Sequence, residues 1–251
     1  MQSLSTAEKL RYLYLATTAL CLYMIVWILV LPASGLQDWV SMLDSVREKV
    51  MLARHVPPGL ISKFKGHYAV HLTHTFPAAL WSALIPFQLN PGFRNRNPRL
   101  HRIMGYTFMA TSSIMMVGVA IIFQRGLLFV KFLEEVPHDP FYTSEIYLTC
   151  LSIWFLWTAG MATMEARRRR FASHQYWILR HIASGMWIAV MRVLLTCIGP
   201  FFMPPFYSGT VSQVVQGRLF SSGAFVGLVI TVLASEYAIR LLKEDQLKKR
   251  P

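Results

Sequence analysis

The chain has 251 residues, of which 54% are hydrophobic and 15% are charged, and its mean hydropathy is +0.41. Soluble proteins carry about 25% charged residues, so this composition excludes an ordinary soluble domain and indicates an integral membrane protein. The formal net charge of +13 would suggest a nucleic-acid partner in a soluble protein, but in a membrane protein its meaning depends on where the basic residues lie.

Six stretches are apolar and long enough to predict transmembrane helices, because about 20 residues cross the hydrocarbon core of a bilayer. We therefore expect an all-α fold, with residues 1–251 forming a single transmembrane domain of about six helices. The first stretch follows a short polar tail, as in a signal peptide, but it is too long for the apolar core of one and we interpret it as an uncleaved span. The predicted spans are residues 11–33, 67–89, 103–125, 144–166, 178–202 and 219–241.

Basic residues are concentrated in alternate connections between these spans, namely residues 90–102, residues 167–177 and the tail after Ile239. The positive-inside rule places such connections in the cytoplasm. We therefore expect cytoplasmic N- and C-termini in a multi-pass protein of the plasma membrane or an organelle membrane. Most of the net charge then serves orientation and contact with anionic lipid headgroups on the cytoplasmic side, and we expect no nucleic-acid partner.

The outer connection between the first two predicted spans, residues 34–66, is too long for a simple turn. Within it, apolar residues recur at helical spacing from Leu36 to Val50, while charged residues occupy mostly the other positions. This pattern predicts an amphipathic helix that lies on the outer surface or caps the bundle.

Three histidines share one face at the outer end of the second predicted span, where ionisable groups at membrane depth are functional candidates. His67 and His71 are four residues apart and can bind one metal ion, whereas His74 lies about 10 Å from His67 along the helix axis. A metal site would therefore need ligands from elsewhere, such as His138 or Asp139. The alternative is a polar helix face that is turned into the bundle near water.

Histidines on two other predicted spans indicate a second kind of site, on the cytoplasmic side. Haem iron can be bound by imidazoles from two neighbouring helices, which must then lie at the same depth. His101 and His181 meet this requirement in the predicted topology, and His174 lies about a turn outside it. Haem b is therefore a candidate cofactor. The alternative is that these histidines form hydrogen bonds with glutamates and headgroups at the membrane interface.

A single arginine, Arg192, lies about a dozen residues into the fifth predicted span, at a depth close to that of His74. No carboxylate is predicted at this depth in any span. A cation without an acidic partner must be stabilised by backbone carbonyls, a water-filled cavity or an anionic ligand. The sequence therefore leaves two interpretations open: a pocket for an anionic or polar ligand around Arg192 and His74, or a structural arginine.

Three sequence blocks follow one another in a specific order and spacing: His74 followed by "ALIPFQLNP", then "NPRLHRIMGY", then "FASHQYWILR" with Arg192 twelve residues after Arg180. Together these blocks resemble the predicted multi-pass membrane proteins grouped as domain of unknown function 2306, over a family-like core of residues 66–200. The resemblance favours His74 over His67 and His71, and His174 over His181. The ligand-binding candidates at family-like positions are His74, Gln88, His101, Arg102, His174, Arg180 and Arg192.

The family brings no settled activity, so three functional hypotheses remain. The first is a membrane redox protein that binds haem or a quinone. The second is a transporter or a polar- or anionic-ligand binding membrane protein that uses His74 and Arg192. The third is a non-catalytic membrane scaffold. No nucleophile elbow, phosphate loop or zinc motif of the usual spacing is present in the sequence.

Overall fold

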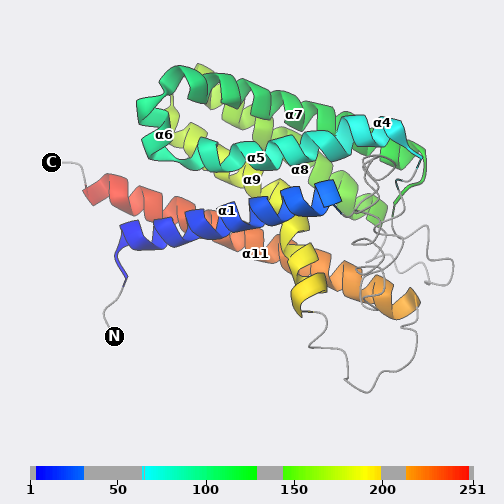
Figure 1. The fold of residues 1–251 in the computed structure, drawn as a ribbon. Coiled ribbons are helices and arrows are strands. Elements are labelled where there is room, and N and C mark those ends of the chain that lie inside the picture. The colour runs from blue at the N-terminus through cyan, green and yellow to red at the C-terminus, as the bar shows by residue number, and fades with distance from the viewer. Residues whose placement is uncertain (1–3, 31–63, 65, 129–143, 199–212, 249–251) are drawn as a thin grey trace.

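The computed structural model describes residues 4–30, 64, 66–128, 144–198 and 213–248, and every regular element within these ranges is a helix. This confirms the predicted all-α membrane bundle. The predicted amphipathic helix from Leu36 to Val50 lies outside the described residues. Figure 1 shows the helices, which are α1 (Thr6–Val30), α4 (Tyr68–Val70), η2 (His71–Thr75), α5 (Phe76–Leu89), α6 (Pro91–Arg96), α7 (Pro98–Gln124), α8 (Ser144–Arg167), α9 (Phe171–Val193), η5 (Leu194–Ile198) and α11 (Gln213–Lys248).

Five helical stretches within the described ranges are long and apolar enough to cross a membrane: Thr6–Ile28, Pro98–Gln124, Ile146–Arg167, Phe171–Thr196 and Phe220–Lys248. The second predicted span is also helical, as α4, η2 and α5 follow one another without a break. At 1.5 Å per residue it is about 33 Å long, which matches the hydrocarbon thickness of a bilayer.

The π-helical turn η2 interrupts this second span at the point where the sequence demands it. Pro77 has no backbone N–H, and its ring would collide with the carbonyl of Thr73 in a regular α-helix. The turn from His71 to Thr75 widens immediately before this proline. Widened turns of this kind occur frequently at functional sites, so η2 makes the region around His74 a candidate functional site.

Helix α9 starts earlier than predicted, at Phe171 instead of residue 178. The connection from α8 is a tight turn in which Arg169 adopts a left-handed backbone conformation with φ 58°. The predicted start was wrong because the polar residues before Ile178 lower the hydropathy without ending the helix. The last helix likewise continues to Lys248, past the predicted end at residue 241.

The basic connections meet at one end of the bundle, which we call the arginine-rich end. Figure 1 shows the start of α1, the short helix α6, the turn from α8 to α9 and the last turns of α11 together at that end. The predicted grouping of these segments on one side agrees with this arrangement. The basic residues of this end in α6, α7 and the α8–α9 turn are Arg94, Arg96, Arg99, Arg102 and Arg167 to Arg170.

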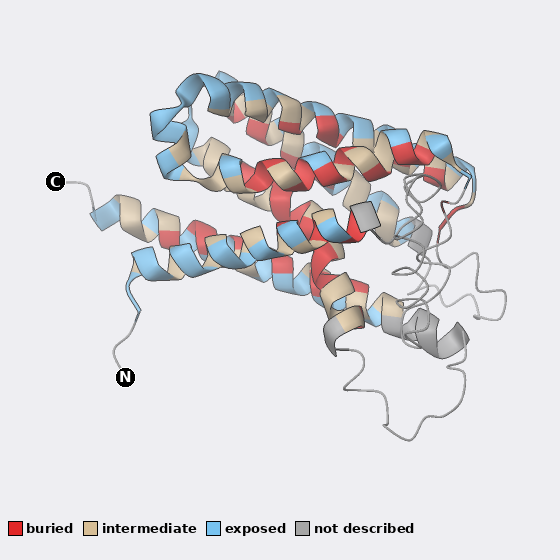
Figure 2. Ribbon diagram, viewed as in Figure 1, coloured by how far each residue is buried: buried red, intermediate tan, exposed pale blue. Residues whose placement is uncertain are grey.

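Helix α9 forms the centre of the bundle. Its most apolar window is 61% buried, whereas the corresponding windows of the other four long helices are only 17–33% buried. Figure 2 shows buried residues on α9 and on the inner faces of its neighbours, with exposed residues on the outer faces. The outer faces carry large apolar side chains such as Val117, Trp157 and Leu233, as expected of a surface in contact with lipid.

Glycines allow the helices around α9 to approach closely. A Cβ atom at Gly227 of α11 would lie 2.7 Å from the carbonyl oxygen of Trp187, and one at Gly185 of α9 would lie 2.7 Å from the ring of Trp81. Small residues at helix crossings are the usual way in which membrane helices pack. These crossings hold α11 and α5 against α9 and so define the space that remains between the helices.

Candidate functional site

A cavity of about 500 Å³ lies between the spanning helices, and the residues that line it belong to the halves of these helices away from the arginine-rich end. Small-molecule sites occupy about 300–1,000 Å³ and are mainly apolar with a few polar groups, and this cavity has the same character. Its apolar wall includes Met115, Phe155 and Trp187. The polar side chains that line it are His74, Thr75, Ser82, Tyr147, Ser152, Ser184, Arg192, Ser221 and Ser222.

His74 reaches the cavity from the π-helical turn η2, which is held closely against α7. A Cβ atom at Gly118 would lie 2.6 Å from the Cβ of His74 and 2.8 Å from its backbone nitrogen. The two helices can therefore touch only because residue 118 has no side chain. The Nδ1 atom of His74 lies 3.4 Å from the carbonyl oxygen of Met115, one turn earlier on α7.

Arg192 reaches the same cavity from the end of α9. Its guanidinium lies over the ring of Trp27 at 5.1 Å, and Nη1 is 3.5 Å from the sulfur of Met24. An aromatic face attracts a cation and provides part of its stabilisation. No ion pair between Arg192 and a carboxylate is present in the described part of the chain, and its Nε atom is buried without a hydrogen-bond partner there.

A second polar atom at the cavity is also unsatisfied. The hydroxyl oxygen of Thr75, next to His74, is buried and has no hydrogen-bond partner among the described residues. Buried polar groups are nearly always hydrogen-bonded, and exceptions require an explanation such as a bound water or ligand. Two such atoms, in Thr75 and Arg192, belong to side chains that line one cavity.

His181, the proposed haem ligand, lies in the fully buried core of the bundle. Its Nε2 is 2.9 Å from the hydroxyl of Ser112, and its Nδ1 is 3.2 Å from both the carbonyl of Phe155 and the hydroxyl of Thr158. Both ring nitrogens thus have partners within the protein. Ser112 also accepts a hydrogen bond of 3.0 Å from the indole of Trp81, so this network joins α5, α7, α8 and α9.

The predicted matching depth of His101 and His181 is not found in the structure. His181 meets α7 at Ser112, which lies eleven residues after His101, or about 16 Å further along the helix axis. The prediction was wrong because α9 begins earlier than residue 178, so that His181 lies deeper in the bundle than expected. Two axial ligands of one iron must lie at one depth, and these two histidines do not.

Gln88, His101 and His174 lie near the arginine-rich end and do not line the cavity. The side-chain amide of Gln88 donates a hydrogen bond of 3.3 Å to the carbonyl of His101, and its oxygen lies 3.5 Å from where a Cβ of Gly105 would be. His174 Nδ1 is 2.8 Å from the carbonyl of Ala162. Gln88 therefore links the first two sequence blocks by a hydrogen bond. His174 contacts the backbone of α8 and so helps to hold α9 against it.

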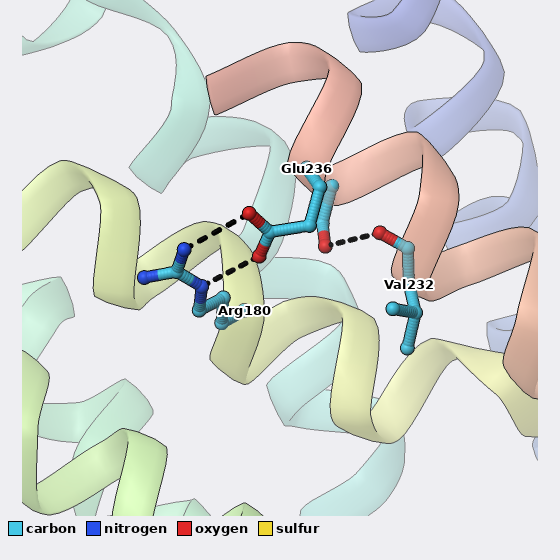
Figure 3. Close-up of polar contacts among 4 residues, drawn as sticks. Arg180, Val232 and Glu236 are labelled. Atoms are coloured by element: carbon cyan, nitrogen blue, oxygen red, sulfur yellow. Dashed lines mark hydrogen bonds and ion pairs between the residues drawn. The ribbon is translucent and has the colours of Figure 1, made fainter. Parts of the chain in front are cut away.

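Arg180 and Arg102, two further candidates, also lie outside the cavity lining. Figure 3 shows the guanidinium of Arg180 paired with both carboxylate oxygens of Glu236 on α11, at 2.6 and 2.9 Å. The charge of Arg180 is therefore matched within the protein. Arg102 is exposed on the first turns of α7.

Among the described residues, no third potential ligand joins His67 and His71. No group of three or more potential metal ligands occurs in the ranges that the structure describes. His67 Nδ1 lies 3.2 Å from a guanidinium nitrogen of Arg125, and His71 is buried with its ring edge against Phe64. The additional ligands considered from the sequence, His138 and Asp139, lie outside the described residues, so the metal site stays a prediction.

These features define a helical membrane protein with a mainly apolar cavity between its spanning helices. The chain matches the family model described as predicted membrane protein (DUF2306), domain of unknown function 2306, over residues 71–230. This is more than half of its length, so the chain belongs to this family, which confirms the resemblance carried by the three sequence blocks. The match extends past residue 200 into α11. No curated protein and no solved structure matches the chain.

Sequence reasoning identified His74 and Arg192 but missed the residues that position them. Gly118 could have been noticed as an isolated glycine within a helical pattern, which often has a packing reason. Trp27 and Met24, which surround the guanidinium of Arg192, carry no distinguishing pattern, because apolar residues are expected throughout a span.

Proposed function

We propose that this protein binds an apolar molecule with one anionic headgroup, in the cavity lined by His74 and Arg192. The observation that carries this proposal is the buried Nε atom of Arg192 at the wall of a mainly apolar cavity, which has no hydrogen-bond partner among the described residues. An anionic headgroup placed there would accept hydrogen bonds from the guanidinium, and the apolar wall would surround the rest of the ligand.

The charge of Arg192 favours an anion over a neutral ligand. A cation that is removed from water without an acidic partner is costly, and the ring of Trp27 compensates only part of that cost. A carboxylate or a similar anion would neutralise the charge and form strong, charge-assisted hydrogen bonds. A neutral quinone would accept hydrogen bonds but would leave the charge unmatched.

The surroundings of the cavity favour a ligand that arrives from the bilayer. Two of the lining residues, Phe225 and Val226, are 63% and 43% exposed on α11. The lining thus includes the lipid-facing surface of that helix. A molecule with an apolar body can therefore approach from the hydrocarbon region without crossing water.

Tryptophan fluorescence provides a direct test, because Trp81 and Trp187 line the cavity and bromine quenches indole emission on contact. We would titrate the purified protein in detergent with dibromostearate and, separately, with its uncharged methyl ester. We expect saturable quenching by the carboxylate that unbrominated stearate reverses, and only non-saturable quenching by the ester, which partitions into the micelle.

Variants of two arginines provide the matched comparison. Arg192→Gln should raise the Kd for dibromostearate by at least about tenfold, or 1.4 kcal/mol, and Arg192→Lys should retain part of the affinity because it keeps the charge. Arg102→Gln removes an exposed arginine outside the cavity lining and should leave the Kd unchanged. Equal affinity for the carboxylate and the ester, or an unchanged Kd in Arg192→Gln, would overturn the proposal.

A further inference from the structure

A second hollow lies between α7 and α8 and shares no lining residue with the cavity around His74 and Arg192. It is an open groove of about 500 Å³, lined by Met109 and Ser113 of α7, by residues of α8 from Leu156 to Arg167, and by Arg168 of the following turn. The groove runs along the bundle toward the arginine-rich end, because its lining there consists of Arg167, the last residue of α8, and Arg168 in the turn after it.

Small side chains contribute to the groove: Ala159, Gly160 and Thr163 of α8 line it, opposite Ser113 of α7. A Cβ atom at Gly160 would meet no atom within 4 Å, so α7 does not fill the space in front of this glycine. Close to it on the same helix, Ile153 and Trp157 are 63% and 58% exposed. This surface of α8 therefore faces the acyl chains of the surrounding bilayer.

The end of the groove carries positive charge that the protein only partly neutralises. Arg168 and Arg170 share one buried carboxylate, Glu165, at 3.6 and 4.0 Å. Arg167 has no ion-pair partner in the parts of the chain that the structure describes. Gly160 and Arg167 are seven residues apart, so an apolar groove and a cationic site lie within about 10 Å along one helix.

We propose that this groove is a binding site for one anionic phospholipid of the bilayer. One acyl chain lies against Gly160 and Met109, and the phosphate group accepts hydrogen bonds from Arg167 and Arg168. Arginine is well suited to phosphate because its guanidinium offers several donors in a planar fork. Basic residues near the membrane surface attract anionic headgroups, and the groove adds a defined position for the acyl chain.

Native mass spectrometry of the full-length protein, released from micelles with added lipid, tests this site. The probes are phosphatidylglycerol, which is anionic, and phosphatidylcholine of the same acyl chains, which has no net charge. We expect the wild type to retain one phosphatidylglycerol in preference to phosphatidylcholine. Two variants probe the two halves of the site: Arg167→Gln with Arg168→Gln for the headgroup, and Gly160→Leu, which fills the groove.

Each variant has a matched control. Arg94→Gln with Arg96→Gln removes the same charge from the same end of the bundle but away from the groove, and Ala110→Leu adds an apolar side chain at an exposed position of α7 that does not line it. We expect the two groove variants to lower retention of phosphatidylglycerol about tenfold and the controls to leave it unchanged. Apparent melting temperatures confirm that all four variants fold.

Two results would overturn the proposal. If Gly160→Leu binds phosphatidylglycerol as well as the wild type does, the arginines attract headgroups in general and the groove holds no lipid. If Arg94→Gln with Arg96→Gln weakens binding as much as the Arg167 and Arg168 variant does, retention depends on total charge and not on this site. Dibromostearate binding, measured on the same proteins, is expected to stay unchanged and separates this site from the cavity around Arg192.

Discussion

Arg180 and Glu236 join α9 to α11 through a two-pronged ion pair, with Nε–Oε1 2.6 Å and Nη2–Oε2 2.9 Å. The guanidinium also lies 5.0 Å from the centre of the Trp177 ring. Because Glu236 is partly exposed, we expect Glu236→Gln to lower stability by only about 1 kcal/mol. This corresponds to a decrease of about 2–4 °C in the apparent melting temperature, measured in detergent.

A double variant separates the energy of the interaction between Arg180 and Glu236 from the effect of each residue alone. Arg180→Gln combined with Glu236→Gln should be no less stable than either single variant, because removing both partners leaves no unpaired charge. Glu244→Gln is the control, since its partner Arg240 is 79% exposed and the expected change is close to zero. Fully additive losses in the double variant would show that the two residues do not interact.

His181 connects four helices, and its loss should be among the most damaging single changes in the core. His181→Ala removes a buried ring and leaves Ser112 and Thr158 without one of their partners. We expect a loss of about 2–4 kcal/mol, visible as a large decrease in the apparent melting temperature. His174→Ala, which removes one hydrogen bond to Ala162, should cost less. Equal losses in the two variants would contradict the central position of His181.

Gly118 and Gly160 give opposite expectations for the same substitution. Gly118→Ala places a Cβ atom 2.6 Å from that of His74, so the backbone must shift, at a cost of about 1–3 kcal/mol. Gly160→Ala meets no atom within 4 Å and should be neutral or stabilising, because alanine favours the helix. Thermal unfolding measures both. Dibromostearate should bind more weakly to Gly118→Ala because His74 must shift, and wild-type affinity in this variant would contradict the proposed part of His74 in the binding site.

The arrangement of the histidines predicts that this protein does not hold a haem between His101 and His181. Both nitrogens of His181 already have partners, and the two residues differ in depth by about 16 Å along α7. We expect an absorbance spectrum without a Soret band that depends on either residue, even after addition of haem. A band present in the wild type and absent from both His101→Ala and His181→Ala would contradict the structure.

The basic residues at one end of the bundle predict its orientation in the membrane. We expect the arginine-rich end, with both termini, to face the cytoplasm, because Arg94, Arg99 and Arg167 to Arg170 lie there. A fluorescent reporter fused after Pro251 should therefore be fluorescent, and alkaline phosphatase fused at the same position should be inactive. The reverse result would place the arginine-rich end outside and contradict the positive-inside prediction.

Several features of the fold could be predicted because they depend on local properties of the chain. Helical spans follow from runs of apolar residues, and the second span was predicted over 67–89 and observed from Tyr68 to Leu89. Boundaries within polar sequence were less certain. The start of α9 at Phe171 was missed because a helix that leaves the hydrocarbon region can continue through polar residues such as His174.

The sequence also predicted the depth of Arg192, because position along a helix determines depth at 1.5 Å per residue. It likewise predicted that no carboxylate in the spans lies at this depth. The same counting failed for His101 and His181, since an error in one helix boundary shifts every later residue of that helix. Depth alone also could not show whether Arg180 binds a ligand or pairs with a carboxylate of the protein. Its partner Glu236 is on another helix and is found only when α9 and α11 pack together.

The sequence by itself determined that this protein is a helical membrane protein with a basic end, and that His74 and Arg192 lie at similar depth. These properties depend on composition and on spacing within single helices. Only the tertiary structure decided that both residues line one cavity, that His181 is sealed in the core and that Gly118 holds η2 against α7. These contacts join residues of different helices. They depend on the rotation of each helix about its axis and on the distance between helices, which side chains from distant parts of the chain determine jointly.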